Sequence, residues 1–267
     1  MAKVFVIDWK NCVGCHNCQI GCKDEHCDNE WMPYAQQQPM AGQFWCKLNQ
    51  YERGTRPHVK VTYLLTMCNH CDEAPCVKAA PDAIYKRDDG LVIIDPVKAK
   101  GNKKIVDSCP YHVIYWNEEL SLPQKCTGCA HLLDGDHPVS VPRCMDNCHV
   151  DVVQFGEESD LDLSGCEVMN PEYGTKPRVY YRGGLPKKFV AGTVYDPGEE
   201  EVIIGAKVTL TGDAGIFNAT TDRWGDFWLR DLPDADFALT IEADGKIKTM
   251  SVSTNVKDVG LGDIALV

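Results

Sequence analysis

Several features that are common in proteins are missing from this sequence, and each absence excludes a class of function. No apolar run approaches the ~20 residues that a helix needs to cross a bilayer, so no membrane anchor is expected. The amino terminus has neither the apolar core of a secretory signal nor an arginine pair, which predicts a cytoplasmic location. Acidic residues outnumber basic ones by 39 to 27, and this net charge of −12 argues against binding to nucleic acid.

The signatures of hydrolytic and nucleotide chemistry are missing as well. The chain has no glycine-rich loop of the phosphate-binding type and no nucleophile elbow. Aspartate and glutamate are plentiful, but none lies in a pattern typical of acid–base catalysis. We therefore predict that this chain carries no catalytic residue.

Cysteine is abundant in the first two-thirds of the chain and absent after Cys166. The fifteen cysteines do not have the spacings of a small disulfide-stapled domain, and zinc sites usually close with two C-x2-C pairs. The first run has the 2-2-3 spacing of bacterial ferredoxins and consists of Cys12, Cys15, Cys18 and Cys22. In that pattern three thiolates hold one cluster and the fourth reaches another. We therefore predict iron–sulfur clusters and single-electron transfer.

Four cysteine blocks can be aligned along the chain. The second block ends at Ala80 instead of a cysteine, the third retains only Cys109, and the fourth contains a 14-residue insertion after Cys129. In paired blocks of this kind, the last cysteine of one block binds the cluster that the first three cysteines of the other block hold. Applied here, this rule gives three complete sets of four ligands. These sets are Cys12, Cys15, Cys18 and Cys148 for cluster 1; Cys126, Cys129, Cys144 and Cys22 for cluster 2; and Cys68, Cys71, Cys76 and Cys109 for cluster 3.

The fourth set is missing as a group. Its positions are occupied by Ala80, Ala99, Asn102 and Ile105. Random loss would scatter over several clusters, whereas all four losses here fall on one, which supports the pairing and indicates that one redox site was removed whole.

The remaining cysteines and the nearby histidines are assigned other roles. We predict small buried hydrophobic residues at Cys27, Cys46 and Cys166. Every predicted set is already complete with thiolates, so the neighbouring histidines are interpreted as hydrogen-bond donors or surface residues. They are His16, His26, His70, His131 and His149.

The composition changes near residues 175–188, where proline and glycine are concentrated. Before this segment, short β-branched strands are expected at 4–7, 91–94, 113–116 and 152–155, each followed or preceded by a cysteine loop and a brief helix. After it, period-two alternation predicts an antiparallel sheet structure. We therefore predict an α+β protein. Residues 1–185 would form a tandem bacterial-ferredoxin-like domain with three [4Fe–4S] clusters, and residues 186–267 a small all-β sandwich or barrel.

The four-block layout over residues 3–166 resembles the iron–sulfur electron-transfer subunits of the molybdopterin oxidoreductase family, the dimethyl sulfoxide reductase type. The resemblance implies a large partner subunit that carries molybdenum bis-molybdopterin guanine dinucleotide. It also implies that cluster 1 lies nearest the molybdenum and that the missing cluster would be the far end of the chain of clusters. In the last part, the segments GTVYD, GAKVTL and TDRWGDF resemble carboxypeptidase-regulatory or prealbumin-like sandwiches.

Three clusters followed by such a β-domain are similar to the small subunits of transhydroxylases of the pyrogallol–phloroglucinol type. Those heterodimeric molybdenum enzymes move a hydroxyl group between polyhydroxylated benzenes with 1,2,3,5-tetrahydroxybenzene as co-substrate, and their reaction has no net electron flow. The resemblance implies that this chain is the non-catalytic electron-transfer subunit of such an oxidoreductase. Two alternatives remain open: the electron-transfer subunit of a respiratory molybdopterin reductase or dehydrogenase, and a stand-alone polyferredoxin with a β binding module.

Overall fold

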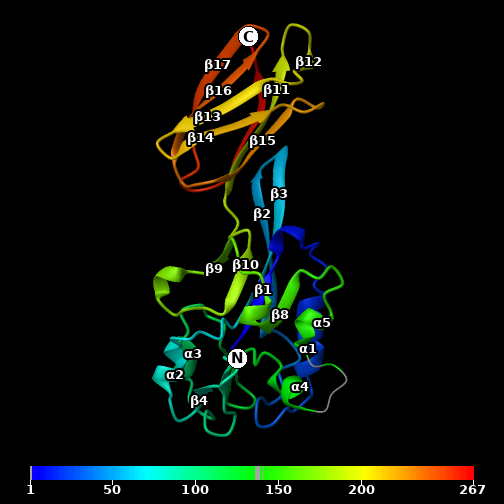
Figure 1. The fold of residues 1–267 in the computed structure, drawn as a ribbon. Helices are drawn as coiled ribbons and strands as arrows, with labels where there is room; N and C mark the ends of the chain where they lie inside the picture. The colour runs from blue at the N-terminus through cyan, green and yellow to red at the C-terminus, as the bar shows by residue number, and fades with distance from the viewer. Residues whose placement is uncertain (1, 136–138, 140) are drawn as a thin grey trace. The chain divides into compact units, whose positions relative to one another are not determined.

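The computed structural model describes residues 2–135, 139 and 141–267, and these residues form two compact units (Figure 1). The first unit contains the chain up to Gln50 and the segment Tyr63–Leu185. The second unit contains Tyr51–Thr62 and Pro186–Val267. The sequence-based division at residues 185 and 186 did not anticipate that residues 51–62 leave the first unit. Part of the predicted insertion after Cys129, namely residues 136–138 and 140, lies outside the described residues.

A four-stranded sheet forms the centre of the first unit. Its strand order is β8 (Val153–Glu157), β1 (Lys3–Ile7), β10 (Val179–Arg182) and β9 (Cys166–Val168). The strand β1 pairs in parallel with β10 and antiparallel with β8. Four successive residues of β1, Val4 to Ile7, are at most 1% exposed, as expected for a central strand that is covered on both faces.

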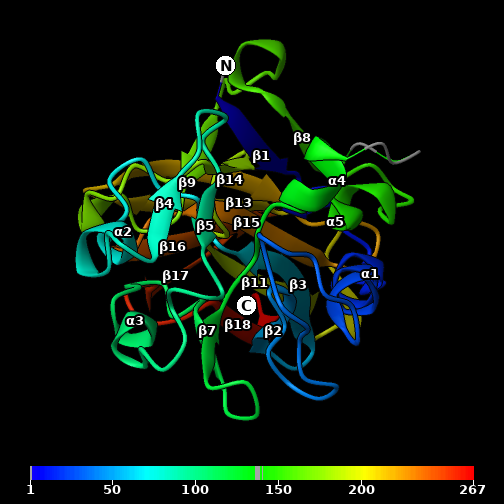
Figure 2. The same cartoon turned by 90° about the horizontal axis from the view of Figure 1, so that it is seen from below.

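Short hairpins and helices surround this sheet and carry the cysteine loops. The hairpins are β2 (Cys46–Thr55) with β3 (His58–Met67), β4 (Ile84–Lys86) with β5 (Val92–Ile94), and β6 (Tyr115–Asn117) with β7 (Leu122–Gln124). The α-helices are α1 (Asn17–His26), α2 (Pro75–Ala79), α3 (Lys104–Asp107), α4 (Ala130–Asp134) and α5 (Arg143–Asp146). Three 3₁₀ turns complete the unit at Trp9–Asn11, Glu158–Asp160 and Pro171–Tyr173. In both views α1 lies beside α5 (Figures 1 and 2).

The second unit is an all-β sandwich of two four-stranded sheets. One sheet contains β12 (Glu201–Val202), β11 (Lys188–Asp196), β15 (Asp226–Leu232) and β18 (Val259–Ala265). The other has the order β14 (Gly215–Thr220), β13 (Lys207–Gly212), β16 (Asp236–Ala243) and β17 (Lys246–Ser253). The predicted alternation is visible in β13, where Val208 and Leu210 are fully buried and Lys207 is exposed. Side chains from both sheets share one apolar core.

The helices of the described residues do not include one that is both long and apolar enough to cross a membrane.

Candidate iron–sulfur sites

The four cysteines predicted for cluster 1 line a single cavity in the first unit. Cys12, Cys15 and Cys18 approach it from the loop before α1 and from α1 itself, and Cys148 follows α5. The cavity contains about 390 Å³ of space not filled by atoms, and apolar side chains such as Leu65 complete its wall. Packing of α1 against α5 is what brings Cys148 to a loop more than a hundred residues earlier in the sequence.

A second cavity of similar size, about 330 Å³, is lined by the four cysteines predicted for cluster 3. Cys68, Cys71 and Cys76 come from the loop before α2 and from α2 itself, while Cys109 follows α3. Burial raises the pKa of Cys71 to about 12 and that of Cys76 to about 11, and the neighbouring thiolate of Cys68 adds to both shifts. Cys109, the single thiol of the third block, therefore lies with the second block in space.

The four cysteines predicted for cluster 2 are also close together and buried. Cys22 lies on α1, Cys144 lies on α5, and Cys126 and Cys129 precede α4. Burial, followed by repulsion from the thiolate of Cys22, raises the pKa of both Cys126 and Cys129 well above the ordinary value. The packing of α1 against α5 brings the helices of Cys22 and Cys144 together, and both cysteines lie in one buried cluster with Cys126.

The donor chemistry of the three sets fits a cationic iron–sulfur group. Burial and repulsion among neighbouring thiolates raise the pKa of Cys71 and of Cys126, whereas the positive charge of bound iron would stabilise the thiolates and release the protons. In the described part of the chain, no group of three or more His, Cys, Asp or Glu converges tightly enough to hold a single metal ion. The cysteines of the cluster 1 and cluster 3 sets instead line the walls of cavities. Bound there, [4Fe–4S] clusters would supply one-electron chemistry.

The first C-x2-C turn of each of the three sets has the same backbone geometry. In each turn the residue before the second cysteine has a positive φ: 69° at Gly14, 43° at His70 and 64° at Gly128. This conformation directs a backbone N–H to the first cysteine of the turn. The N–H of Gly128 lies 3.3 Å from Cys126 Sγ, and that of His70 lies 3.4 Å from Cys68 Sγ. Such donors stabilise a thiolate, so the turn prepares the ligand before any cluster binds.

These left-handed positions were not identified from the sequence, although the Gly-Cys pairs in CVGC and CTGC were an available signal. Glycine suits the position because a side chain disfavours positive φ. A Cβ at Gly14 would also lie 2.3 Å from the ring of Tyr63. His70 adopts the same conformation without being glycine, and its Nδ1 accepts a hydrogen bond from the backbone N–H of Val92 at 2.9 Å.

Several histidines lie within reach of the predicted ligands. Nε2 of His26 is 3.9 Å from Cys129 Sγ, and Nδ1 of His149 is 3.8 Å from Cys15 Sγ. Burial, with a further contribution from His131, lowers the pKa of His26 to about 3, so this ring is neutral. A neutral ring at this distance can donate N–H to sulfur, which is the role expected for His26.

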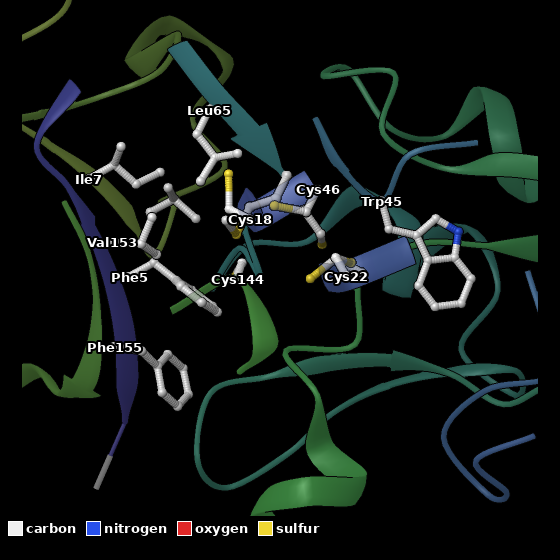
Figure 3. Packing of buried hydrophobic residues seen from close by; sticks show 14 of the residues in the cluster. Phe5, Ile7, Cys18, Cys22, Trp45, Cys46, Leu65, Cys144, Val153 and Phe155 are labelled. Atoms are coloured by element: carbon white, nitrogen blue, oxygen red, sulfur yellow. The ribbon is translucent and has the colours of Figure 1, made fainter. Parts of the chain in front are cut away.

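The three cysteines outside the sets occupy different environments. Cys46 is 1% exposed and lies among Cys18, Cys22 and Cys144, as Figure 3 shows. Hydrogen bonding to these three sulfurs, together with burial, raises its pKa well above the ordinary value and keeps the thiol protonated.

Burial was predicted for all three of these cysteines, and for two of them the prediction is wrong. Cys27 and Cys166 are only partly buried. Cys27 ends α1, where its Sγ lies 3.7 Å from Met40 Sδ, and Cys166 lies in β9 at the edge of its sheet. Helix ends and edge strands reach solvent, which the spacing of cysteines does not reveal.

The positions of the missing fourth set are filled by an apolar core. Ala80, Ala99 and Ile105 are 8%, 0% and 1% exposed and pack in one cluster with Ile84 and Leu122. Asn102, the fourth position, is partly buried. Three positions that were assigned to one lost cluster by counting along the sequence therefore lie together in space.

Comparison with known proteins identifies the family. Residues 59–158 match the model of the 4Fe-4S dicluster domain, and residues 190–266 match the carboxypeptidase regulatory-like domain. The chain is 41% identical to the pyrogallol hydroxytransferase small subunit of Pelobacter acidigallici over 98% of both proteins. It is 31% identical to a tetrathionate reductase subunit of Salmonella typhimurium, over 67% of this chain and 71% of that subunit. It is 30% identical to a subunit of the anaerobic dimethyl sulfoxide reductase of Escherichia coli, over 66% of this chain and 85% of that subunit.

These matches agree with both halves of the predicted α+β architecture and with the predicted [4Fe–4S] chemistry. Similarity to the pyrogallol hydroxytransferase subunit extends over nearly the whole chain, whereas the reductase subunits match about two-thirds of it. The chain therefore belongs to the iron–sulfur electron-transfer subunits of the dimethyl sulfoxide reductase type of molybdenum enzyme, the family that includes the small subunit of pyrogallol hydroxytransferase.

Proposed function

We propose that this chain is the electron-transfer subunit of a heterodimeric molybdenum transhydroxylase that interconverts polyhydroxybenzenes of the pyrogallol and phloroglucinol type. The chain would hold three [4Fe–4S] clusters on the twelve cysteines of the three sets. A large partner subunit would carry the molybdenum bis-molybdopterin guanine dinucleotide and all catalytic groups, with 1,2,3,5-tetrahydroxybenzene as co-substrate. A relative whose name states pyrogallol hydroxytransferase is similar to this chain over 98% of both lengths, and this supports the assignment.

The observation that carries the proposal is the apolar core at the fourth position. A respiratory reductase must exchange electrons with an outside carrier, and the resemblance to the family makes the fourth cluster the natural exit. Ala80, Ala99 and Ile105 lie buried in one apolar cluster at that place. A transhydroxylation moves a hydroxyl group without net electron flow. An enzyme of this kind therefore does not need a fourth cluster to pass electrons to an outside carrier.

The exposure of the ligands supports the expected order of the clusters. Ten of the twelve cysteines are buried, whereas Cys12 is partly buried and Cys15 is exposed, and both belong to the cluster 1 set. The neighbouring apolar residues Val13 and Ile20 are 56% and 60% exposed. An exposed ligand loop flanked by apolar side chains suits docking to the large subunit, where an electron must cross a short distance.

The experiment is to co-purify the native complex, to measure molybdenum and iron, and to assay conversion of pyrogallol. We expect a large molybdenum-containing partner, about twelve irons per copy of this chain, and transhydroxylase activity that depends on the co-substrate. Purification of the chain alone, without molybdenum, would favour a stand-alone polyferredoxin. If the complex exchanges electrons between a substrate and an artificial redox dye but does not convert pyrogallol, the result would favour a respiratory reductase or dehydrogenase. Cell fractionation tests the cytoplasmic location that is part of this proposal.

A further inference from the structure

A buried lysine lies at the junction of two of the candidate sites. Lys125 is 3% exposed, directly precedes Cys126 of the cluster 2 set, and lines the cavity of the cluster 3 set. Lysine is almost never fully buried unless its charge is balanced. Cysteine spacing did not single out this residue, although it stands immediately before a C-x2-C pair.

The hydrogen bonds of Lys125 suit the charged form of its side chain. Its Nζ donates to the carbonyl oxygen of Val92 at 2.5 Å and to that of Cys126 at 3.1 Å. An ammonium group has three donors and no acceptor, and both carbonyl partners are acceptors.

The groups that surround this side chain include the cluster ligands themselves. Lys125 lines one cavity with Cys68 and Cys76 of the cluster 3 set, and it directly precedes Cys126 of the cluster 2 set. No ion pair with a carboxylate is found for Lys125 within the residues that the structure describes. The lysine therefore faces two thiolate sets at once.

We propose that Lys125 is a shared electrostatic residue that raises the reduction potentials of clusters 2 and 3 together. This inference rests on the proposed cluster sites. Reduction adds one negative charge to a cluster, and a fixed positive charge in a site shielded from water stabilises that reduced form. The candidate site of cluster 1 lies outside this contact, because Lys125 is not among the residues that line its cavity.

The test is a potentiometric titration of the purified complex, followed by EPR, with Lys125→Met and Lys125→Arg. We expect Lys125→Met to lower the equilibrium constant for reduction of two of the three clusters by about tenfold, which corresponds to a midpoint about 59 mV lower for a one-electron couple. The third cluster should move much less. Lys125→Arg retains the charge and should keep both midpoints close to those of the unmodified complex.

Lys86 provides a matched control. Its Nζ also donates to backbone carbonyls of the cluster 3 loop, those of His70 and Cys71, at 3.0 and 3.1 Å. Its charge is already balanced by Asp72 at 3.0 Å, and its side chain is 27% exposed. Lys86→Met should therefore leave the midpoints nearly unchanged.

Three results would overturn the proposal: unchanged midpoints in Lys125→Met with all clusters bound, an equal shift of all three clusters, or an equal shift in Lys86→Met. If Lys125→Met loses iron, Lys125→Gln keeps a donor for the carbonyls and is titrated instead. Loss of iron in both neutral variants, with Lys125→Arg normal, would assign Lys125 a structural role and overturn the proposal too. If the unmodified complex held fewer than three clusters, the proposed function would be wrong. That result differs from the three above, so failure of the proposed function can be told apart from failure of the proposed role of Lys125.

Discussion

At the residue scale, the backbone turn beside a thiol prepares it as a ligand. In the turns that begin at Cys68 and Cys126, a backbone N–H two residues later points at the sulfur. The left-handed residue that makes this possible is glycine in one turn and His70 in the other. A donor to sulfur favours the thiolate and raises the potential of a bound cluster. Local geometry and redox tuning therefore depend on the same few backbone atoms.

The cross-pairing of the blocks can be tested at Cys109. Because Cys109 lines the same cavity as Cys68, Cys109→Ala is expected to remove the same EPR signal as Cys68→Ala and to reduce iron by about four per chain. Cys166→Ala is the control, since Cys166 lies outside every set and should keep all the iron. If Cys109→Ala instead removed the signal that disappears in Cys126→Ala, the pairing would be wrong.

At the scale of elements, the tip of the β2–β3 hairpin belongs to the second unit and is held there by an ion pair. Arg53 Nε and Nη2 donate to the two carboxylate oxygens of Asp258 at 2.9 and 2.7 Å. The two side chains are only 13% and 9% exposed. The guanidinium also lies over the ring of Phe189, 5.6 Å from its centroid. A paired, desolvated charge of this kind specifies where the hairpin docks.

We expect Arg53→Met to lower the free energy of unfolding of the second unit by about 3 kcal/mol, because it leaves the Asp258 carboxylate buried and unpaired. Hydrogen exchange in residues 51–62 should become faster. The double variant Arg53→Met with Asp258→Asn removes both charges and should recover part of the loss. If the losses of unfolding free energy in the two single variants simply add in the double variant, the ion pair is not what holds the hairpin in place.

A second ion pair, in the first unit, predicts a pH dependence. Arg87 binds the carboxylate of Asp134 through two N–H groups, at 2.5 and 2.7 Å, and joins α4 to the β4–β5 hairpin. The Arg87 guanidinium lowers the pKa of Asp134 to about 2. The pKa of a carboxylate in the unfolded chain is about 3.9, so the pair stabilises the fold above about pH 4. That contribution is lost as the pH falls through about 2.

Asp134→Asn is therefore expected to lower the apparent melting temperature at pH 7, and the difference from the unmodified protein should shrink between pH 4 and pH 2. The effect is worth about 1 kcal/mol at most, because the Asp134 side chain is 36% exposed and solvent screens the pair. Glu118→Gln is the control, since its pair with Lys103 is exposed and should not affect melting. A difference that stayed constant down to pH 2 would contradict the pKa assignment.

At the scale of the whole molecule, the three candidate cluster sites are accompanied by a fourth position that holds no cysteine. Aliphatic side chains fill that position, in the same buried cluster as Cys71, Cys76 and Cys109 of the cluster 3 set. The first unit therefore keeps a tandem arrangement in which one position contributes to stability by burying apolar surface. This division fits an enzyme that passes no electrons onward.

Restoring the four thiols at 80, 99, 102 and 105 tests this view. Ala80→Cys, Ala99→Cys, Asn102→Cys and Ile105→Cys combined should add about four irons and a new EPR signal, because they restore all four thiols of the missing set. No single substitution among them should add iron. Ile105→Cys alone should reduce stability by about 1 kcal/mol, since it removes buried apolar volume. If any single variant gained iron, the assignment of positions 80, 99, 102 and 105 to one missing cluster would be wrong.

Most strands, the all-β second unit and the class of cofactor could be predicted from the sequence, because the patterns that indicate them lie within short segments of the chain. The β-branched run at 4–7 forms the predicted strand, and the runs at 91–94, 113–116 and 152–155 form strands displaced by one or two residues. Alternation in residues 186–267 predicted the all-β unit, which the carboxypeptidase regulatory-like match confirms. Thiol spacing, strand alternation and turn residues are all properties of neighbours along the sequence.

Other features were decided only when distant segments met. The sequence by itself determined the class of cofactor and the family, because thiolate chemistry and spacing leave few alternatives. Tertiary structure decided that Cys46 lies among three ligands while Cys27 and Cys166 reach solvent, and that residues 51–62 join the second unit. It also placed the charge of Lys125 between two thiolate sets. Burial and electrostatic balance depend on which segments pack together, and no local pattern encodes that.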